Sequence, residues 1–253
     1  MFLSAKLKFI TIVYLILLNM VFSKQGFCAT PGNNIIILNT TGKPPLNNEQ
    51  MQGFMDQVAL EAFRRIGFTL KTVSLPAERA LLNANKLRID GEMSRIADLQ
   101  YKYPNLVQVP EKIMDWEFVA IGIPGLNSEL GWRSLAGKSV AFINGWKILE
   151  KNITPVTEVK KVKGPESLFR LLLNKRVDFV IYERWAGAKF IKDLSLNHAS
   201  INLPALAKRK MFIYLNKKHA PLVNELAVAL RNMKADGTYS QIEEQTLKQY
   251  TDH

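Results

Sequence analysis

The segments KLRID (residues 86–90) and NKRVD (residues 174–178) decide the fold of this 253-residue chain. In each segment, cationic residues end a helix-forming stretch, and an isoleucine or valine with an aspartate follows. Cations stabilise the C-terminal end of a helix dipole, and the short apolar run that comes next indicates a buried strand. The same helix-to-strand junction therefore occurs twice, which predicts two similar α/β lobes in series.

The residues before the first junction alternate between strand and helix patterns. Apolar residues recur at three- and four-residue spacing through residues 51–66, which indicates an amphipathic helix that stops at Gly67. A second helix is expected from Pro76 to Lys86. The expected strands are residues 34–39, 68–73 and 89–93. This alternation favours a parallel α/β layer with right-handed crossovers.

The second half repeats the alternation and then changes. The expected strands are residues 117–123, 139–143, 156–162 and 177–182, and the expected helices are residues 146–151 and a leucine-rich stretch at 168–172. Residues 211–215 predict a further strand, and Pro221 opens a helix. The residues from Thr238 to Gln241 have the form of a capping box for a last helix.

The composition limits the functions that are open to the chain. Hydrophobic residues make up 47% and charged residues 22%, which excludes a collagen-like or globally disordered protein. One cysteine and three scattered histidines exclude a disulfide framework and a cysteine-based zinc site. No dinucleotide, phosphate-loop, zinc-protease or nucleophile-elbow motif is present. We therefore expect no cofactor, no metal and no enzymatic activity.

The N-terminus has the layout of a secretory signal peptide. Two lysines precede an apolar run at residues 9–22, and small and polar residues follow. Cleavage after Ala29 or after Ser23 fits, so we expect residues 1–29 to be a signal peptide and the protein to be exported to the periplasm. Two alternatives stay open, namely an uncleaved anchor and a lipoprotein that is acylated on Cys28.

Several short motifs, in this order, resemble the bacterial solute-binding protein family 3, the polar-amino-acid type of ABC transporter substrate-binding proteins. They are GKPPL (42–46), GF (53–54), RIDG (88–91), LAGKSV (135–140), RVD (176–178) and MKADGTY (233–239). The resemblance covers nearly all of the chain after residue 30. It implies a type II periplasmic binding protein fold, with two α/β lobes joined by two crossover segments around a ligand cleft.

The same resemblance implies how the chain is divided and what it does. Lobe 1 would combine residues 30–120 with 212–253, and lobe 2 would be residues 121–211. The expected function is capture of a small polar ligand, zwitterionic or anionic and amino-acid-like, by hinge closure. The expected partner is the membrane permease of an ABC importer or a sensor kinase, and we expect a monomer.

The resemblance also implies positions for ligand-binding residues. Arg95, which comes after the aspartate-bearing strand of the first lobe, would bind a carboxylate, and Ser94 would donate a second hydrogen bond. The segment around Arg95 is shorter than in the usual amino-acid-binding pattern. Glu183, five residues after Asp178, would bind an amine or a hydroxyl; an ordinary salt bridge to Arg184 or Arg79 is the alternative.

Four further residues are candidates for the cleft. Lys43 stands where relatives often place an aromatic side chain, and it would add a cation or remain a solvated loop residue. Arg79 would reach an anion or pair with a nearby carboxylate. Asn144 and Trp146 flank the start of a helix in the second lobe, where backbone amides would bind an anion and the indole would cover the ligand.

Three other functions compete with solute capture. A sensor module would have the same fold, and fold does not settle function. A dehydratase would use Glu183 or Glu92 as a general acid. Nucleic-acid binding would use the basic runs at residues 160–163 and 208–210 and the net charge of +12. These runs lack interleaved aromatic residues, so we interpret them as a solvated face and predict no nucleic-acid partner.

Overall fold

The computed structural model describes residues 34–40, 43–154 and 156–251. The predicted signal peptide, residues 1–29, and Cys28, the acylation site of the lipoprotein alternative, lie outside the described residues. The chain from Ile35 onward forms one compact unit. Among the described residues, no helix combines the length and the apolar character that crossing a membrane requires.

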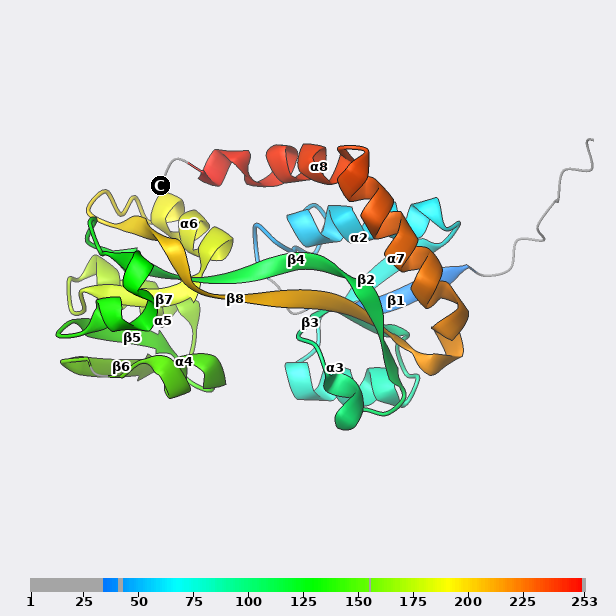
Figure 1. Cartoon of the computed structure of the whole chain (residues 1–253), viewed down its shortest axis with the longest axis horizontal. Coiled ribbons are helices and arrows are strands. Elements are labelled where there is room, and N and C mark those ends of the chain that lie inside the picture. Colours follow the sequence, from blue (N-terminus) through cyan, green and yellow to red (C-terminus); the bar gives the residue numbers. More distant parts are fainter. Residues whose placement is uncertain (1–33, 41–42, 155, 252–253) are drawn as a thin grey trace, which may run out of the picture. The chain divides into compact units, whose positions relative to one another are not determined.

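One eight-stranded mixed sheet organises the protein, in the spatial order β2-β1-β3-β8-β4-β7-β5-β6 (Figure 1). The strands are β1 (Ile35–Asn39), β2 (Thr69–Val73), β3 (Gly91–Arg95), β4 (Leu106–Gly122), β5 (Ser139–Ile143), β6 (Glu158–Val162), β7 (Phe179–Glu183) and β8 (Ser200–Asn216). The order is the same read from either end: three parallel strands, then one antiparallel strand. The sheet therefore contains two equivalent halves.

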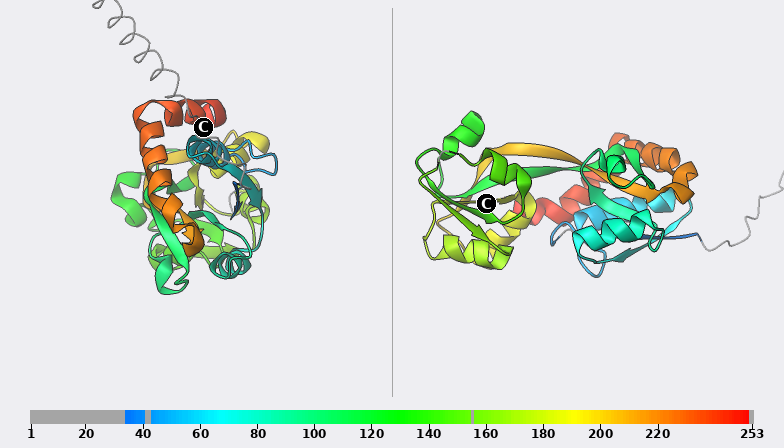
Figure 2. Two further views of the ribbon diagram at one scale, coloured as in Figure 1. Left: turned by 90° about the vertical axis from the view of Figure 1, so that its right-hand side faces the viewer. Right: turned by 90° about the horizontal axis from the view of Figure 1, so that it is seen from below.

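Two long strands connect these halves. β4 and β8 have 17 residues each and pair with one another over nearly their whole length. At one end β8 continues the sheet beside β3, and at the other end β4 continues it beside β7 (Figures 1 and 2). This arrangement confirms the predicted fold of two α/β halves joined by two crossover segments.

The two helix-to-strand junctions fold in the same way. Oδ2 of Asp90 accepts a hydrogen bond from the backbone N–H of Ile37 at 2.8 Å. Oδ2 of Asp178 accepts one from the backbone N–H of Ser139 at 2.7 Å. Each aspartate thus binds the first strand of its own half to the third. The repeated motif that the sequence shows is therefore a repeated backbone-to-carboxylate connection.

Helices cover the faces of both halves. They are α2 (Phe54–Arg65), α3 (Ala77–Asn85), α4 (Lys147–Asn152), α5 (Pro165–Leu173), α6 (Arg184–Asp193), α7 (Ala220–Ala235) and α8 (Thr238–Leu247). In the first half, α2 and α7 bury apolar residues against β1, β3 and β8. In the second half, the cores lie on the two faces of β5 and β7. Burial of these apolar faces is the main stabilising contribution to each half.

The structure corrects four sequence-based expectations. β3 begins at Gly91 rather than at residue 89, because Asp90 is used for the connection to β1. β4 and β8 are far longer than the apolar runs that predicted them, since their middle parts carry polar residues. Helix α6 was not expected. The capping box at Thr238 is wrong: the N-cap residue is Gly237, with φ of +85°, and the backbone N–H of Thr238 donates to Oδ1 of Asp236 at 3.0 Å.

Candidate functional site

A cavity of about 560 Å³ lies where the two halves meet along β4 and β8. Its volume falls in the range of about 300–1,000 Å³ that is typical of small-molecule sites. The lining residues come from both halves and from both long strands: Leu81, Ser94, Arg95, Ile96, Leu99, Trp116, Phe118, Trp146, Lys147, Ile148, Arg209 and Met211. Three predicted site residues, Ser94, Arg95 and Trp146, are therefore brought together here.

Arg95 is held at the end of β3 by a buried carboxylate. Its Nη2 lies 2.8 Å from Oε2 of Glu92, and its Nε donates to the same oxygen at 2.9 Å. Asn39 also donates to this oxygen, at 3.1 Å. Burial raises the pKa of Glu92 above its usual value, while Arg95 and Asn39 act in the opposite direction. The ion pair fixes the guanidinium at the cavity wall and leaves its remaining N–H groups for other acceptors.

Ser94 presents an unused hydroxyl at the same wall. Its side chain is 5% exposed, and Oγ has no hydrogen-bond partner in the structure. A buried hydroxyl without a partner costs free energy, and Ser94 is the residue with such a group that also lines the cavity in the described part of the chain. We therefore interpret Ser94 as a hydrogen-bonding group of this cavity.

Trp146 forms an aromatic wall on the opposite side. Its ring stacks on Tyr182, with ring centroids 5.3 Å apart, and meets the edge of Phe118 at 5.6 Å. These contacts hold the indole in one orientation. Asn144 is exposed and does not line the cavity. The amide of Gly145, which was expected to face an anion, donates to Glu150 at 3.3 Å.

The structure does not bring Glu183 into this cavity. Glu183 is completely buried as the N-cap of α6, and its Oε2 accepts from the backbone N–H of Ala186 at 2.7 Å. Burial raises the pKa of Glu183 to about 7, against the lowering effect of the backbone hydrogen bonds. The expected partner Arg184 pairs instead with Glu117 at 3.0 Å. Glu183 as a ligand contact stays a prediction.

Lys43 and Arg79 also lie outside the cavity. Lys43 is exposed and lines a separate hollow between the loop after β1 and the end of β2. Arg79 is exposed on α3, and within the part of the chain that the structure describes it makes no ion pair. Their roles as ligand contacts stay predictions.

Sequence reasoning missed several cavity residues, chiefly Arg209, Lys147, Trp116 and Phe118. Arg209 belongs to a basic run that we interpreted as a solvated face. Successive side chains of a strand point to opposite faces, so a strand assignment through this run predicts that Arg209 differs from Lys208 and Lys210. The sequence indicated a strand only at residues 211–215, so this alternation applies to Arg209 only because the structure shows that β8 begins at Ser200.

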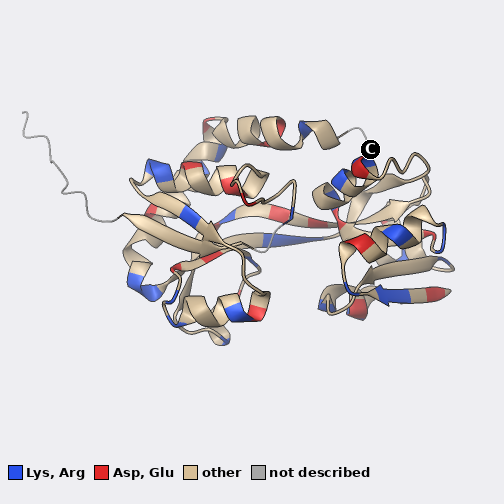
Figure 3. Ribbon diagram, turned by 180° about the vertical axis from the view of Figure 1, so that it is seen from behind, with Lys and Arg blue, Asp and Glu red and all other residues tan. Residues whose placement is uncertain are grey.

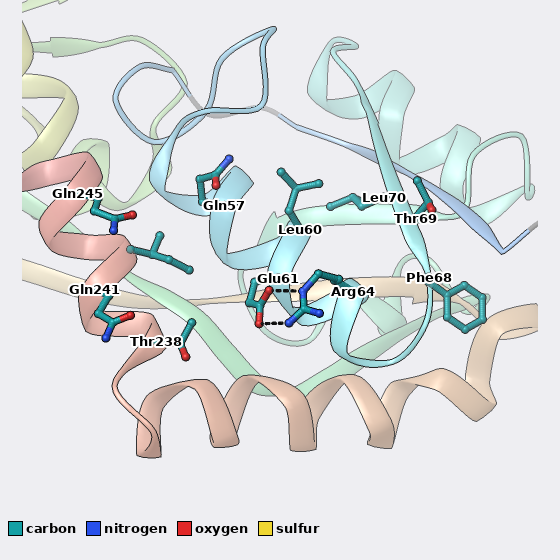
Figure 4. A pocket seen from close by; sticks show the side chains of 11 residues that line it. Gln57, Leu60, Glu61, Arg64, Phe68, Thr69, Leu70, Thr238, Gln241 and Gln245 are labelled. Carbon is teal, nitrogen blue, oxygen red and sulfur yellow. Dashed lines mark hydrogen bonds and ion pairs between the residues drawn. The ribbon is translucent and has the colours of Figure 1, made fainter. Parts of the chain in front are cut away.

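A second hollow lies between α2, β2 and α8 (Figure 4). Its charged residues satisfy one another, because Arg64 binds Glu61 through two hydrogen bonds of 2.6 and 2.9 Å. Within the described part of the chain, no group of three potential ligands can hold a metal ion. In the view of Figure 3, acidic and basic residues are distributed over both halves of the sheet. The cavity along β4 and β8 is therefore the strongest candidate site.

Comparison with known proteins supports the fold. No family model matches the chain. An uncharacterised protein of Shewanella oneidensis is 25% identical over 208 residues, which cover 76% of this chain and 75% of that protein.

Solved structures with the same fold include amino-acid-binding proteins. An ancestral arginine-binding protein bound to glutamine matches with a TM-score of 0.65 and 19% identity, over 85% of this chain and 98% of that one. The GluR0 ligand-binding core in complex with L-glutamate matches with a TM-score of 0.69 and 14% identity, over 84% of this chain and 98% of that one. A histidine kinase sensor domain similar to periplasmic binding proteins matches with a TM-score of 0.63 and 14% identity, over 84% of this chain and 95% of that one. The chain thus has the two-lobed periplasmic binding protein fold.

Proposed function

We propose that this protein is a periplasmic solute-binding protein that captures a small polar ligand, zwitterionic or anionic and amino-acid-like. The observation that carries the proposal is the cavity along β4 and β8, which joins Ser94 and Arg95 of one half to Trp146 and Lys147 of the other. Structures of amino-acid-binding proteins with the same fold support it.

In this proposal the ligand is captured by hinge closure. Residues 30–120 with 212–253 form lobe 1, and residues 121–211 form lobe 2. The long strands β4 and β8 are the only regular elements among the described residues that run through both halves, so a change of twist in them moves one lobe against the other. A ligand that touches both walls of the cavity stabilises the closed form.

The protein is exported with removal of residues 1–29 and works as a monomer. The closed form then delivers its ligand to the permease of an ABC importer. A sensor role is the second candidate, because the same fold occurs in a histidine kinase sensor domain. Uptake of the identified ligand by cells that lack the gene separates the two roles: loss of uptake supports the importer, and normal uptake supports the sensor.

A thermal-shift screen against amino acids, mono- and dicarboxylates with and without an aromatic ring, polyamines and small sugars tests the binding function. A ligand at about 100 times its Kd stabilises the protein by about 2.7 kcal/mol. The matched variants are Ser94→Ala and the exposed Ser195→Ala. Because Oγ of Ser94 is buried without a partner, its removal does not destabilise the free protein, and it weakens binding about tenfold. No shift with any solute contradicts the proposed function.

A further inference from the structure

The cavity along β4 and β8 carries positive charge and no carboxylate of its own. Arg95 comes from the end of β3, Lys147 from the first turn of α4, and Arg209 from β8. None of the twelve lining residues is an aspartate or a glutamate. Three cations from three separate elements thus face one space, which favours an anionic ligand.

The three cations differ in how far they are already neutralised. Arg95 is paired with Glu92, and Lys147 is paired with Glu150 at 2.7 Å. Arg209 has no carboxylate partner among the described residues, and its Nη1 donates only to the main-chain oxygen of Lys208 at 2.9 Å. The guanidinium of Arg209 is therefore the cation that is free to bind an anionic group.

The structure provides no acid at the cavity for a ligand ammonium group. Glu92 is 1% exposed and does not line the cavity; its Oε2 is shared by Arg95 and Asn39, and its Oε1 is buried without a hydrogen-bond partner. Glu183 is fully buried and caps α6. An ammonium group in this space would lose its hydration and face cations, which is costly.

The rest of the lining is apolar and includes three aromatic side chains. Trp116, Phe118 and Trp146 line the cavity together with five aliphatic side chains, Leu81, Ile96, Leu99, Ile148 and Met211. Trp146 is fixed between Phe118 and Tyr182. Such a wall gains free energy by covering an apolar surface of ring size, and gains little from a small polar solute.

We infer that the ligand is a carboxylate with an apolar, ring-sized body and no ammonium group. The carboxylate binds Ser94, Arg95 and Arg209, and the apolar body lies against Trp146 and Phe118. This inference rests on the proposed solute-binding function and narrows its ligand class. It separates this cavity from one built for a zwitterionic amino acid.

Isothermal titration calorimetry with three matched probes tests the ligand class. The probes are 3-phenylpropionate, L-phenylalanine and phenethylamine, which share the ring and differ in their carboxylate and ammonium groups. We expect 3-phenylpropionate to bind at least tenfold more tightly than L-phenylalanine, and phenethylamine not to bind. Tighter binding of L-phenylalanine overturns the inference and leaves the proposed function standing.

Two variants of equal charge change test the position of the carboxylate. Arg209→Gln removes the free cation of the cavity, and Lys210→Gln removes its neighbour, which is exposed like Arg209 but does not line the cavity. We expect Arg209→Gln to weaken 3-phenylpropionate binding at least tenfold and Lys210→Gln to change it less than twofold. Equal effects show attraction by net charge alone and overturn the assigned site. If no carboxylate binds while another solute stabilises the protein, the inference fails and the proposed function survives; if no solute binds, both fail.

Discussion

The guanidinium of Arg95 lies 2.8 Å from the carboxylate of Glu92, which is buried three residues earlier on the same strand. Residues three apart on a strand point to opposite faces, so this contact requires the irregular end of β3, where the pairing with β8 shifts between the two residues. The shift brings the cation to the cavity and keeps its countercharge in the protein interior. The arginine is thereby positioned before any ligand arrives.

Removing Arg95 alone from this ion pair costs more stability than removing both charges. Arg95→Ala leaves the Glu92 carboxylate buried without its countercharge, and we expect it to lower the free energy of unfolding by about 3 kcal/mol. Adding Glu92→Gln to Arg95→Ala removes the buried charge and restores part of that loss. Urea unfolding of the two single variants and the double variant gives the coupling energy.

An exposed pair is the control for this cycle. Arg64→Ala removes the ion pair with Glu61 on the surface of α2 and costs less than about 1 kcal/mol. A coupling energy between Arg95 and Glu92 that is no larger than that of the exposed pair contradicts the buried ion pair.

The repeated aspartates have a common structural role that mutation can measure. Asp90→Ala and Asp178→Ala each leave a backbone N–H without its acceptor, and we expect each to cost about 1–2 kcal/mol. The hydrogen bond from the backbone of Ser139 holds the pKa of Asp178 below its usual value. The ionised carboxylate of Asp178 therefore stabilises the folded protein above pH 3.8, the pKa of the group in the unfolded chain. This stabilisation is lost as the pH falls through the lower pKa of Asp178 in the folded protein.

Chemical denaturation at pH 7 and pH 3 checks this prediction. Asp193→Ala, at the end of α6, is the matched control, because Asp193 is half exposed and pairs only with Lys189. It costs less than about 0.5 kcal/mol. If Asp178→Ala lowers the free energy of unfolding no more than Asp193→Ala does, the junction does not depend on the carboxylate of Asp178.

Glu183 makes stability depend on pH near neutrality. Its pKa rises from 4.5 to about 7 on folding, so between these values the folded protein binds a proton that the unfolded chain has lost. Stability therefore falls as the pH rises through this window, by about 3 kcal/mol. In Glu183→Gln the side-chain oxygen still accepts from Ala186, and the dependence on pH disappears.

Unfolding free energies at pH 5, 6, 7 and 8 measure this effect. We expect Glu183→Gln to exceed the original protein slightly at pH 5 and by about 3 kcal/mol at pH 8. Glu166→Gln, an exposed substitution of the same type on α5, keeps the original profile. If the unfolding free energies of the original protein and of Glu183→Gln change with pH in the same way, this prediction is contradicted.

The strand that carries Ser94 and Arg95 begins at a glycine whose backbone lies too close to β8 for a side chain to fit without a shift. A Cβ at Gly91 would lie 2.0 Å from the backbone oxygen of Tyr214 on β8. Backbone cannot move aside without separating the two strands, so Gly91→Ala should cost about 3 kcal/mol. Because the strand shifts, binding at the cavity weakens as well.

Thermal unfolding and the ligand titration together check this prediction. Gly164→Ala is the control, since its Cβ would meet only the mobile end of Glu166, at 3.3 Å. It should cost less than about 1 kcal/mol and leave binding unchanged. Equal stability of the two alanine variants contradicts the close approach of β3 and β8.

The sequence determined the elements that depend on local pattern. The positions of β1, β2, β5 and α2 follow from apolar runs and spacing, that of α3 from Pro76 at its start, and the two aspartate junctions from a repeated motif. The sequence could not predict the full length of β4 and β8, because their middle parts are polar and form strands only by pairing with one another. Local propensity contains no information about such pairing.

The candidate site shows the same division. The family resemblance implied Ser94 and Arg95 as ligand contacts, and the start of a helix after a strand suggested Trp146. Only the tertiary structure decided that Arg209 joins them and that Glu183 lies apart as a helix cap. The physical reason is that a site between two halves is set by strand register and by which buried charges neutralise one another, and both arise only when distant segments pack together.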